Sequence, residues 1–390
     1  MTSLEPERMV IFVLTEDCNL DCSYCYEKNK RRSSRTMSAE FIRRKVRDEM
    51  LADNEFKKLW FIFFGGEPLL EFDTVRDVVD WFSRENWPST SKEFHFMVET
   101  NGTLLDDSMK EWFSANRGHI TLSLSLDGAK FAHDLNRCNS YEDVAKHLSF
   151  CRDNWPEQPV KMTIGPQTID WTFDGVLHVH DLGLRAEFDV IFDDVWGDAE
   201  SERRAVRVWA EQLQKLVSFY HTRPGLPRPS ALSRRLDRLF VEPSSDNSAF
   251  CGAGKHVTCF TPDELEYPCF RFAPLVVDSP LFNVRAAPVL ENEQCTACPF
   301  ARICPTCEGN NYAVTGSCFK RTSFHCRLFK VSLLASARMH LLDHPEVLRQ
   351  PPEDDSREEK LRRMRMLVVI RLVNDLCSPI LEWASMGSGS

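Results

Sequence analysis

Three cysteines near the start of the chain have the residue type and spacing for metal chemistry. Cys18, Cys22 and Cys25 are spaced x3 then x2, and they follow directly after the apolar run Met9–Leu14. Iron–sulfur clusters are held by cysteine thiolates, four for a cluster of four irons. Three closely spaced thiols can therefore hold three irons and leave the fourth iron with an open position. A small molecule can chelate iron there and receive an electron.

Two other uses of these thiols are less favoured. A structural zinc ion takes four ligands, often from two paired motifs, and no histidine follows Cys25 at a useful spacing. Three cysteines within eight residues also suit a disulfide framework poorly, and a chain of 390 residues has no need of one. Zinc stays open as the alternative metal.

The thiol spacing resembles the signature of the radical S-adenosylmethionine (SAM) enzymes. In that family the amino and carboxylate groups of SAM bind the free iron, and one-electron reduction releases a 5′-deoxyadenosyl radical. The segment Gly65-Gly66-Glu67-Pro68 is similar to the family's GGEP motif, which binds the SAM amino group. On its own, this segment is also a tight turn with Pro68 at the first helical position.

Further segments resemble the subfamily that carries a SPASM domain. Glu99–Thr103 is similar to its TNGT element near the SAM ribose, and Ser123–Gly128 followed by His133–Arg137 is similar to its S-x-D-G and H-D-x-x-R stretches. The resemblance implies SAM or substrate contacts for Tyr24, Gly65, Gly66, Glu67, Asn101, Ser125, Asp127 and Arg137. For His133, Asp134 and Arg137, a network at a helix start is an equally good interpretation.

The C-terminal half contains a second group of cysteines, from Cys251 to Cys326. Short spacings between so many soft ligands favour zinc or iron–sulfur clusters. The run resembles the SPASM domain, which carries two auxiliary 4Fe-4S clusters. The resemblance assigns Cys251, Cys259, Cys269 and Cys307 to one cluster, and Cys295, Cys298, Cys304 and Cys326, in preference to Cys318, to the other.

This cysteine-rich run departs from the SPASM pattern in two places. The pair Cys304 and Cys307 is spaced x2 where x3 is common, and Cys259 need not be a ligand. Without Cys259 the first auxiliary cluster keeps an open iron for a substrate thiolate. We expect the remaining cysteines, Cys138, Cys151 and Cys377, to be buried and inert.

Strand-like runs alternate with amphipathic helical segments up to about residue 195, which predicts βαβ units and a parallel sheet. We expect an α/β fold, a partial (β/α)6 radical SAM barrel followed by a small cysteine-rich SPASM domain and C-terminal helices. The expected divisions are the barrel at 9–222, a linker at 223–249, the SPASM domain at 250–330 and a helical tail at 331–385. In the tail, Leu361, Met364, Val368 and Leu372 share one helix face, for which packing onto the body is favoured over a partner contact.

Composition excludes several function classes. The formal net charge of −10 argues against a nucleic-acid partner. No apolar run is long enough for a membrane span, and the N-terminus has no signal-peptide core. Fifteen cysteines without a secretion signal indicate metal or redox use in a reducing cytoplasm. Met386–Ser390 looks like a cloning remnant.

The combined motifs predict a radical SAM–SPASM enzyme with three 4Fe-4S clusters and SAM. We expect a peptide substrate, a ribosomal precursor, and a flavodoxin- or ferredoxin-type electron donor. A cysteine thioether cross-link is the leading product, with a carbon–carbon link as the second. Formylglycine formation in a sulfatase is less favoured, because its general-base Asp position holds Phe270 here. A non-catalytic iron–sulfur or zinc protein is the alternative of another class. Eight residues before the first strand leave no room for a leader-binding winged helix.

Overall fold

The computed structural model describes residues 6–27, 35–87, 92–240, 251–273, 291–352 and 355–385. Parts of the expected linker (241–249) and SPASM domain (250 and 274–290), and the terminal Met386–Ser390, lie outside the described residues. The contacts divide the chain into two compact units. Unit 1 is Met1–Lys161, Asp181–Arg185 and Asn247–Pro288; unit 2 is Met162–His180, Ala186–Asp246 and Val289–Ser390.

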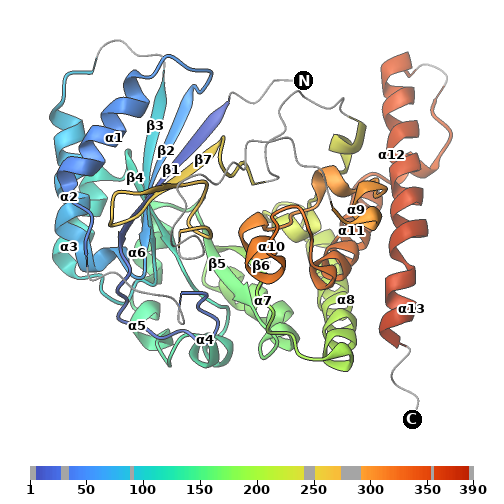
Figure 1. The fold of residues 1–390 in the computed structure, drawn as a ribbon. Coiled ribbons are helices and arrows are strands. Elements are labelled where there is room, and N and C mark those ends of the chain that lie inside the picture. Colours follow the sequence, from blue (N-terminus) through green and yellow to red (C-terminus); the bar gives the residue numbers. More distant parts are fainter. Residues whose placement is uncertain are drawn as a thin grey trace. The chain divides into compact units, whose positions relative to one another are not determined.

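Unit 1 is built on a six-stranded sheet of order β4-β3-β2-β1-β7-β8 (Figure 1). The strands are β1 (Glu7–Thr15), β2 (Lys58–Gly65), β3 (Glu93–Thr100), β4 (Ile120–Leu124), β7 (Val257–Phe260) and β8 (Glu266–Tyr267). β1 to β4 and β7 are parallel, and only β8 runs antiparallel to its neighbour. The carboxyl ends of β1, β2, β3 and β4 therefore lie at one edge of the sheet.

Helices α1 (Ala39–Leu51), α2 (Phe72–Arg84) and α3 (Asp107–Asn116) run along one face of this sheet (Figure 1). In α2 the buried residues Val75, Val78, Val79 and Phe82 recur at helical spacing, so one stripe of the helix faces the sheet. Short helices α4 (Lys130–Asn136), α5 (Tyr141–Ala145) and α6 (Leu148–Asn154) follow β4.

Strands β5 (Pro159–Ile164) and β6 (Arg185–Val190) form a two-stranded sheet. Just beyond β4, Ser125 forms a parallel bridge with Lys161 of β5. The strand-like runs expected up to about residue 195 are thus present as β1 to β6, and the expected α/β fold class is confirmed. The expected domain boundaries stay a prediction.

Unit 2 is mainly helical. It contains α7 (Thr172–Asp181), α8 (Ala199–His221), α9 (Glu293–Thr296), α10 (Glu308–Thr315), α11 (Ser323–Asp343), α12 (Arg357–Cys377) and α13 (Pro379–Ser385). Its core joins Phe300, Phe329 and Leu333 to the buried face of α12, with Cys298 and Cys304 packed against the same cluster. No helix among the described residues is long and apolar enough to cross a membrane.

Two predictions about side chains are wrong in part. On α12 the face that packs carries Val369, Ile370, Val373 and Cys377. Of the expected face, Leu372 is partly buried against the same core, whereas Met364 and Val368 are 59% and 58% exposed and Leu361 is also exposed. The helix has two apolar stripes, and periodicity alone cannot tell which one is buried. Cys138 is likewise exposed, at a positive φ of 56°, while Cys151 and Cys377 are buried as expected.

Candidate active site

The three thiols lie in the loop that leaves the carboxyl end of β1. The loop is pinned to the end of β2 by two backbone hydrogen bonds, from Gly66 N–H to Thr15 O and from Glu67 N–H to Asp17 O, both 2.9 Å. A Cβ built on Gly65 or Gly66 would lie 2.2 Å from the carbonyl oxygen of Thr15 or Asp17. The glycines are therefore required for this close approach of two backbone segments.

The buried carboxylate of Glu67 ties the end of β2 to the end of β3. It is 1% exposed. It accepts hydrogen bonds from Leu69 N–H (3.0 Å), the Thr100 hydroxyl (2.7 Å) and Asn101 N–H (2.8 Å). Burial raises the pKa of Glu67, and these three donors oppose the rise. Glu67 thus holds the site's framework, and its contact with SAM stays a prediction.

The turn after β3 reaches the thiol loop through Asn101. Its Nδ2 donates to Asn19 Oδ1 at 2.9 Å and lies 3.9 Å from Cys18 Sγ. Asn19 in turn donates to the Thr103 hydroxyl at 2.8 Å. These contacts order the backbone next to the first thiol.

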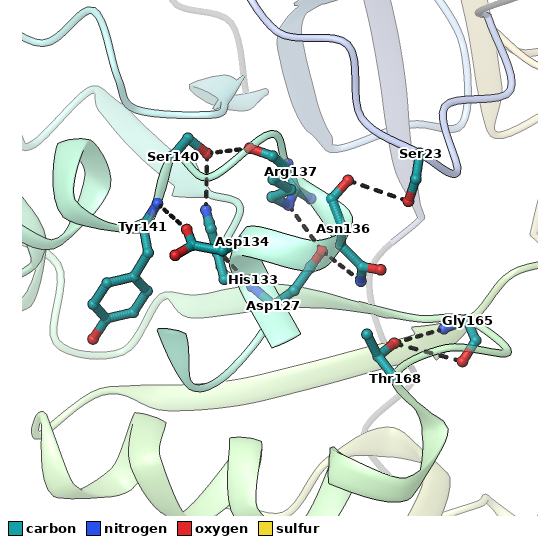
Figure 2. A network of polar contacts seen from close by, with 10 residues as sticks. All are labelled: Ser23, Asp127, His133, Asp134, Asn136, Arg137, Ser140, Tyr141, Gly165 and Thr168. Carbon is teal, nitrogen blue, oxygen red and sulfur yellow. Dashed lines mark hydrogen bonds and ion pairs between the residues drawn. The ribbon is translucent and has the colours of Figure 1, made fainter. Parts of the chain in front are cut away.

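A buried polar network follows β4 (Figure 2). Arg137 Nε and Asn136 Nδ2 both donate to Asp127 Oδ2 at 3.0 Å. Asp127 N–H donates to His133 Nδ1 at 3.2 Å, and His133 Nε2 lies 3.0 Å from the Ser140 hydroxyl. With Nδ1 accepting, Nε2 carries the proton and donates to Ser140.

This network reaches the thiol loop at two points. Ser23 N–H donates to Asn136 O at 2.9 Å (Figure 2 draws the hydroxyl contact of Ser23). The Arg137 guanidinium lies over the Tyr24 ring, 5.4 Å from its centroid. His133 bonds to Asp127 and Ser140, and Asp134 accepts from Tyr141 N–H at 2.9 Å. Arg137 also lines the thiol pocket. Contacts of these three residues with SAM or substrate stay a prediction.

A pocket of about 170 Å³ gathers most of the predicted site. Its lining includes Cys18, Cys22, Tyr24, Cys25, Gly65, Gly66, Asn101, Ser125 and Arg137, and not Glu67 or Asp127. Burial raises the pKa of Cys22 to about 12, and the Arg137 cation opposes that rise. Three thiols with one cation beside them fit a cluster that takes three thiolates and leaves one iron for SAM.

In unit 2, four predicted ligands line one cavity of about 310 Å³, namely Cys295, Cys298, Cys304 and Cys326. Cys318 does not line it; burial raises the pKa of that thiol to about 12, and Glu308 and Cys307 add to the rise. This donor set fits the second auxiliary cluster with Cys326 as its fourth ligand. Among the described residues, no three His, Cys, Asp or Glu side chains converge as for a single metal ion.

The four cysteines expected to hold the first auxiliary cluster belong to both units. Cys259 on β7 is completely buried. Cys269 follows β8, and it lies close enough to Cys259 to raise the pKa of that thiol further. Cys251 is exposed in the same unit. Cys307 belongs to unit 2, so this ligand set stays a prediction.

The sequence motifs gave no sign of one feature near the thiol loop. The Phe270 ring lies 4.5 Å from Phe64 and 6.0 Å from Tyr26, and the Arg271 guanidinium lies 4.4 Å from the Tyr26 centroid. Phe64 and Tyr26 both line the thiol pocket. What the sequence offers toward this aromatic contact is that Tyr26 directly follows Cys25 and Phe270 directly follows Cys269, two predicted cluster ligands.

A parallel sheet with a thiol loop at its carboxyl edge defines the class of the protein. Residues 12–185 match the Radical SAM superfamily. The chain therefore carries a radical SAM domain, and the resemblance seen in the motifs is confirmed. The cofactors of that domain are an iron–sulfur cluster and SAM, which the thiol pocket fits.

Individual proteins match over different lengths. A cysteine-type anaerobic sulfatase-maturating enzyme of Clostridium perfringens is 28% identical over 34% of this chain and 36% of its own length. The subtilosin biosynthesis protein AlbA of Bacillus subtilis is 24% identical over 76% of this chain and 66% of its own. The chain spans little more than a third of the first curated relatives it matches.

Among solved structures, anSMEcpe with bound AdoMet and the Cp18Cys peptide has a TM-score of 0.68. The two chains are 17% identical, and the match covers 86% of this chain and 99% of that chain. At this identity the match supports the fold, including its extension past the radical SAM domain.

Proposed function

We propose that this chain is a radical SAM enzyme that modifies a peptide or protein, and that it forms a cysteine thioether cross-link. The observation that carries the proposal is the pocket in which the three thiols meet Gly65, Gly66, Asn101, Ser125 and Arg137. When bound, the cluster and SAM supply a 5′-deoxyadenosyl radical, which removes hydrogen from an unactivated carbon.

The residues around the pocket position these groups. Glu67 and the two glycines fix the thiol loop on the end of β2. Asp127 neutralises and aims Arg137, whose cation lies beside Cys22 and Tyr24. Residues 250–330 have the proposed role of carrying the auxiliary clusters.

Forming a thioether removes one hydrogen from carbon and one proton from the substrate thiol, and makes one S–C bond. The carbon hydrogen would leave in 5′-deoxyadenosine, and an auxiliary cluster, when bound, would take up the remaining electron. A small redox protein of flavodoxin or ferredoxin type is the proposed source of the electron that starts each turnover.

The surroundings of Phe270 favour a thioether over formylglycine, because formylglycine chemistry needs a general base there. The aromatic rings of Tyr26 and Phe64 pack against Phe270, and the Glu27 carboxylate, which lines the thiol pocket, is hydrogen-bonded to Tyr26. Of the nearby acids, Asp263 is paired with Arg35 at 2.9 Å and Glu264 with Arg44 at 3.6 Å, all four being well exposed. Glu266 accepts from the Thr258 hydroxyl at 2.9 Å.

Formylglycine formation is the less favoured candidate, and it is supported by the similarity to the Clostridium perfringens enzyme. The structures of anSMEcpe and the protein AlbA support a polypeptide substrate for both candidates. A carbon–carbon cross-link from the same radical stays the second candidate product.

The first experiment compares anaerobically reconstituted wild type with a Cys18/Cys22/Cys25→Ala variant. We expect roughly twelve irons in wild type, about four fewer in the variant, and 5′-deoxyadenosine from wild type alone. Stoichiometric zinc with no SAM cleavage would refute the radical proposal and leave a zinc protein.

The second experiment reads the product on a cysteine-containing candidate substrate peptide. A thioether keeps the sulfur and blocks thiol alkylation. Formylglycine from cysteine loses the sulfur and gives a hydrazide-reactive aldehyde. A carbon–carbon link leaves the thiol free to alkylate, so each result selects one product.

A further inference from the structure

The cavity with four thiols in unit 2 also contains two arginines that have no assigned role. Arg234 follows the 3-10 helix Ser230–Leu232, and Arg321 precedes α11; both line the cavity with Cys304. The Nε atom of each arginine is buried and has no hydrogen-bond partner among the described residues. A buried N–H without an acceptor is costly, so its presence calls for a partner.

Neighbouring groups hold both arginines in place. The backbone N–H of Arg321 donates to Asn292 Oδ1 at 2.7 Å. Its side-chain Nη2 donates at 3.3 Å to the carbonyl oxygen of Ala301, a residue between Cys298 and Cys304 in the sequence. The backbone N–H of Arg234 donates to the Ser336 hydroxyl at 3.3 Å, and the Arg234 guanidinium lies 5.8 Å from the centroid of the Phe329 ring. The Arg321 side chain is thus held at the cavity wall by a hydrogen bond, and the Arg234 side chain lies against the Phe329 ring.

The charge of these two arginines is not matched by an ion pair in the described parts of the chain. Arg327, which lines the same cavity, is paired with Glu202, and Arg235, next to Arg234, is paired with Asp237 at 2.7 Å. Arg234 and Arg321 form no such pair there. Asp189 and Lys330 also line the cavity.

Carboxylates and a thiol also lie near Arg234. Burial lowers the pKa of Arg234, and Asp189, Glu187 and Cys304 oppose that change.

A cluster held by four thiolates is anionic, and its sulfurs accept hydrogen bonds. Net charge and hydrogen bonds to sulfur set the reduction potential of such a cluster. We propose that Arg234 and Arg321 are positioning residues that donate their Nε–H groups to the sulfurs of the cluster held by Cys295, Cys298, Cys304 and Cys326, and thereby raise its reduction potential. The inference rests on the cluster of the proposed function, but not on its product.

A raised potential suits the role of electron acceptor. After the carbon hydrogen has been removed, one electron must leave the substrate as the new bond forms. A cluster that is easier to reduce takes this electron more readily.

The test is a potentiometric titration, followed by electron paramagnetic resonance, of the full chain reconstituted in the Cys18/Cys22/Cys25→Ala background, which leaves the auxiliary clusters. Arg234→Gln and Arg321→Gln should keep the full iron content. Each should lower the reduced-to-oxidised ratio of one cluster at least tenfold at a fixed potential, which is about 59 mV for a one-electron couple. Arg234→Lys keeps the charge but loses the Nε–H donor. The reduction potential of the cluster in this variant should lie between that of the protein with Arg234 and that of Arg234→Gln.

Arg235→Gln is the matched control because it removes a neighbouring but paired guanidinium, and it should leave the titration unchanged. Unchanged potentials in both Gln variants would overturn the inference, as would loss of iron in Arg234→Lys and Arg234→Gln alike. Zinc in this cavity would also overturn it. If the arginine variants show the expected shifts but wild type makes no 5′-deoxyadenosine, the proposed function alone is refuted.

Discussion

Asp127→Asn is the sharpest test of how the site is held. The Asp127 and Arg137 side chains are 2% and 9% exposed and meet at 3.0 Å. Removing one partner of a buried ion pair leaves an uncompensated charge, at a cost of about 3–5 kcal/mol. The substitution also weakens the acceptor for Asn136, whose carbonyl holds Ser23 in the thiol loop.

Native-state hydrogen exchange measures this cost locally. In peptides spanning residues 120–141, a loss of about 3 kcal/mol should speed amide exchange by at least about 100-fold. Asp143→Asn is the control, because Asp143 and Lys146 form an exposed pair at 3.0 Å worth less than ~1 kcal/mol.

Adding Arg137→Met to Asp127→Asn should recover part of the loss, since no buried charge is then left without a partner. Exchange in Asp127→Asn that matches Asp143→Asn would refute the reasoning. It would mean that the pair contributes nothing beyond a surface contact.

Three further predictions address the framework, its pH dependence and the second cluster. Gly66→Ala places a Cβ 2.2 Å from Asp17 O and should lose about four irons on reconstitution, whereas Gly118→Ala, which meets open space, should keep them. Burial lowers the pKa of His133 to about 4, below the ~6.5 of an unfolded histidine, so the unfolded state binds more protons between these values. Stability to urea should therefore fall as the pH drops from about 6.5 toward 4, by up to roughly 3 kcal/mol, and His133→Gln should flatten that slope; an equal slope in both proteins would contradict this. Cys326→Ala should lose about four irons and Cys318→Ala none, and the reverse result would reassign the ligand.

The sequence predicts the sheet well because each strand is a run of buried apolar residues with a turn signal at its end. Helix α1 begins at Ala39, where the sequence carries a cap signal, since Ser38 accepts from Phe41 N–H. The amphipathic pattern over Tyr141–Asp153 does not form one continuous helix, however. His147 N–H donates to Val144 O, three residues back, so the turn tightens and α6 starts afresh at Leu148.

Other features depend on contacts that no local pattern carries. Strand β7 has four residues, and its pairing with β1 joins Met9 to Val257. The two apolar stripes of α12 are equally good candidates for burial until Phe329 and Leu333 are in place. Motif spacing could place thiols near strand ends, but it could not show that Glu67 binds two strand ends together.

Strand β1 lies between β2 and β7, so two segments far apart in the chain complete its hydrogen bonding. During synthesis, β2 emerges soon after β1, but Val257–Phe260 leaves the ribosome only after most of the chain has been made. Until then the far edge of β1 is open, which is the kind of edge that recruits other nascent chains. Chains released early, before residue 257, should therefore aggregate rather than accumulate as a soluble half-enzyme.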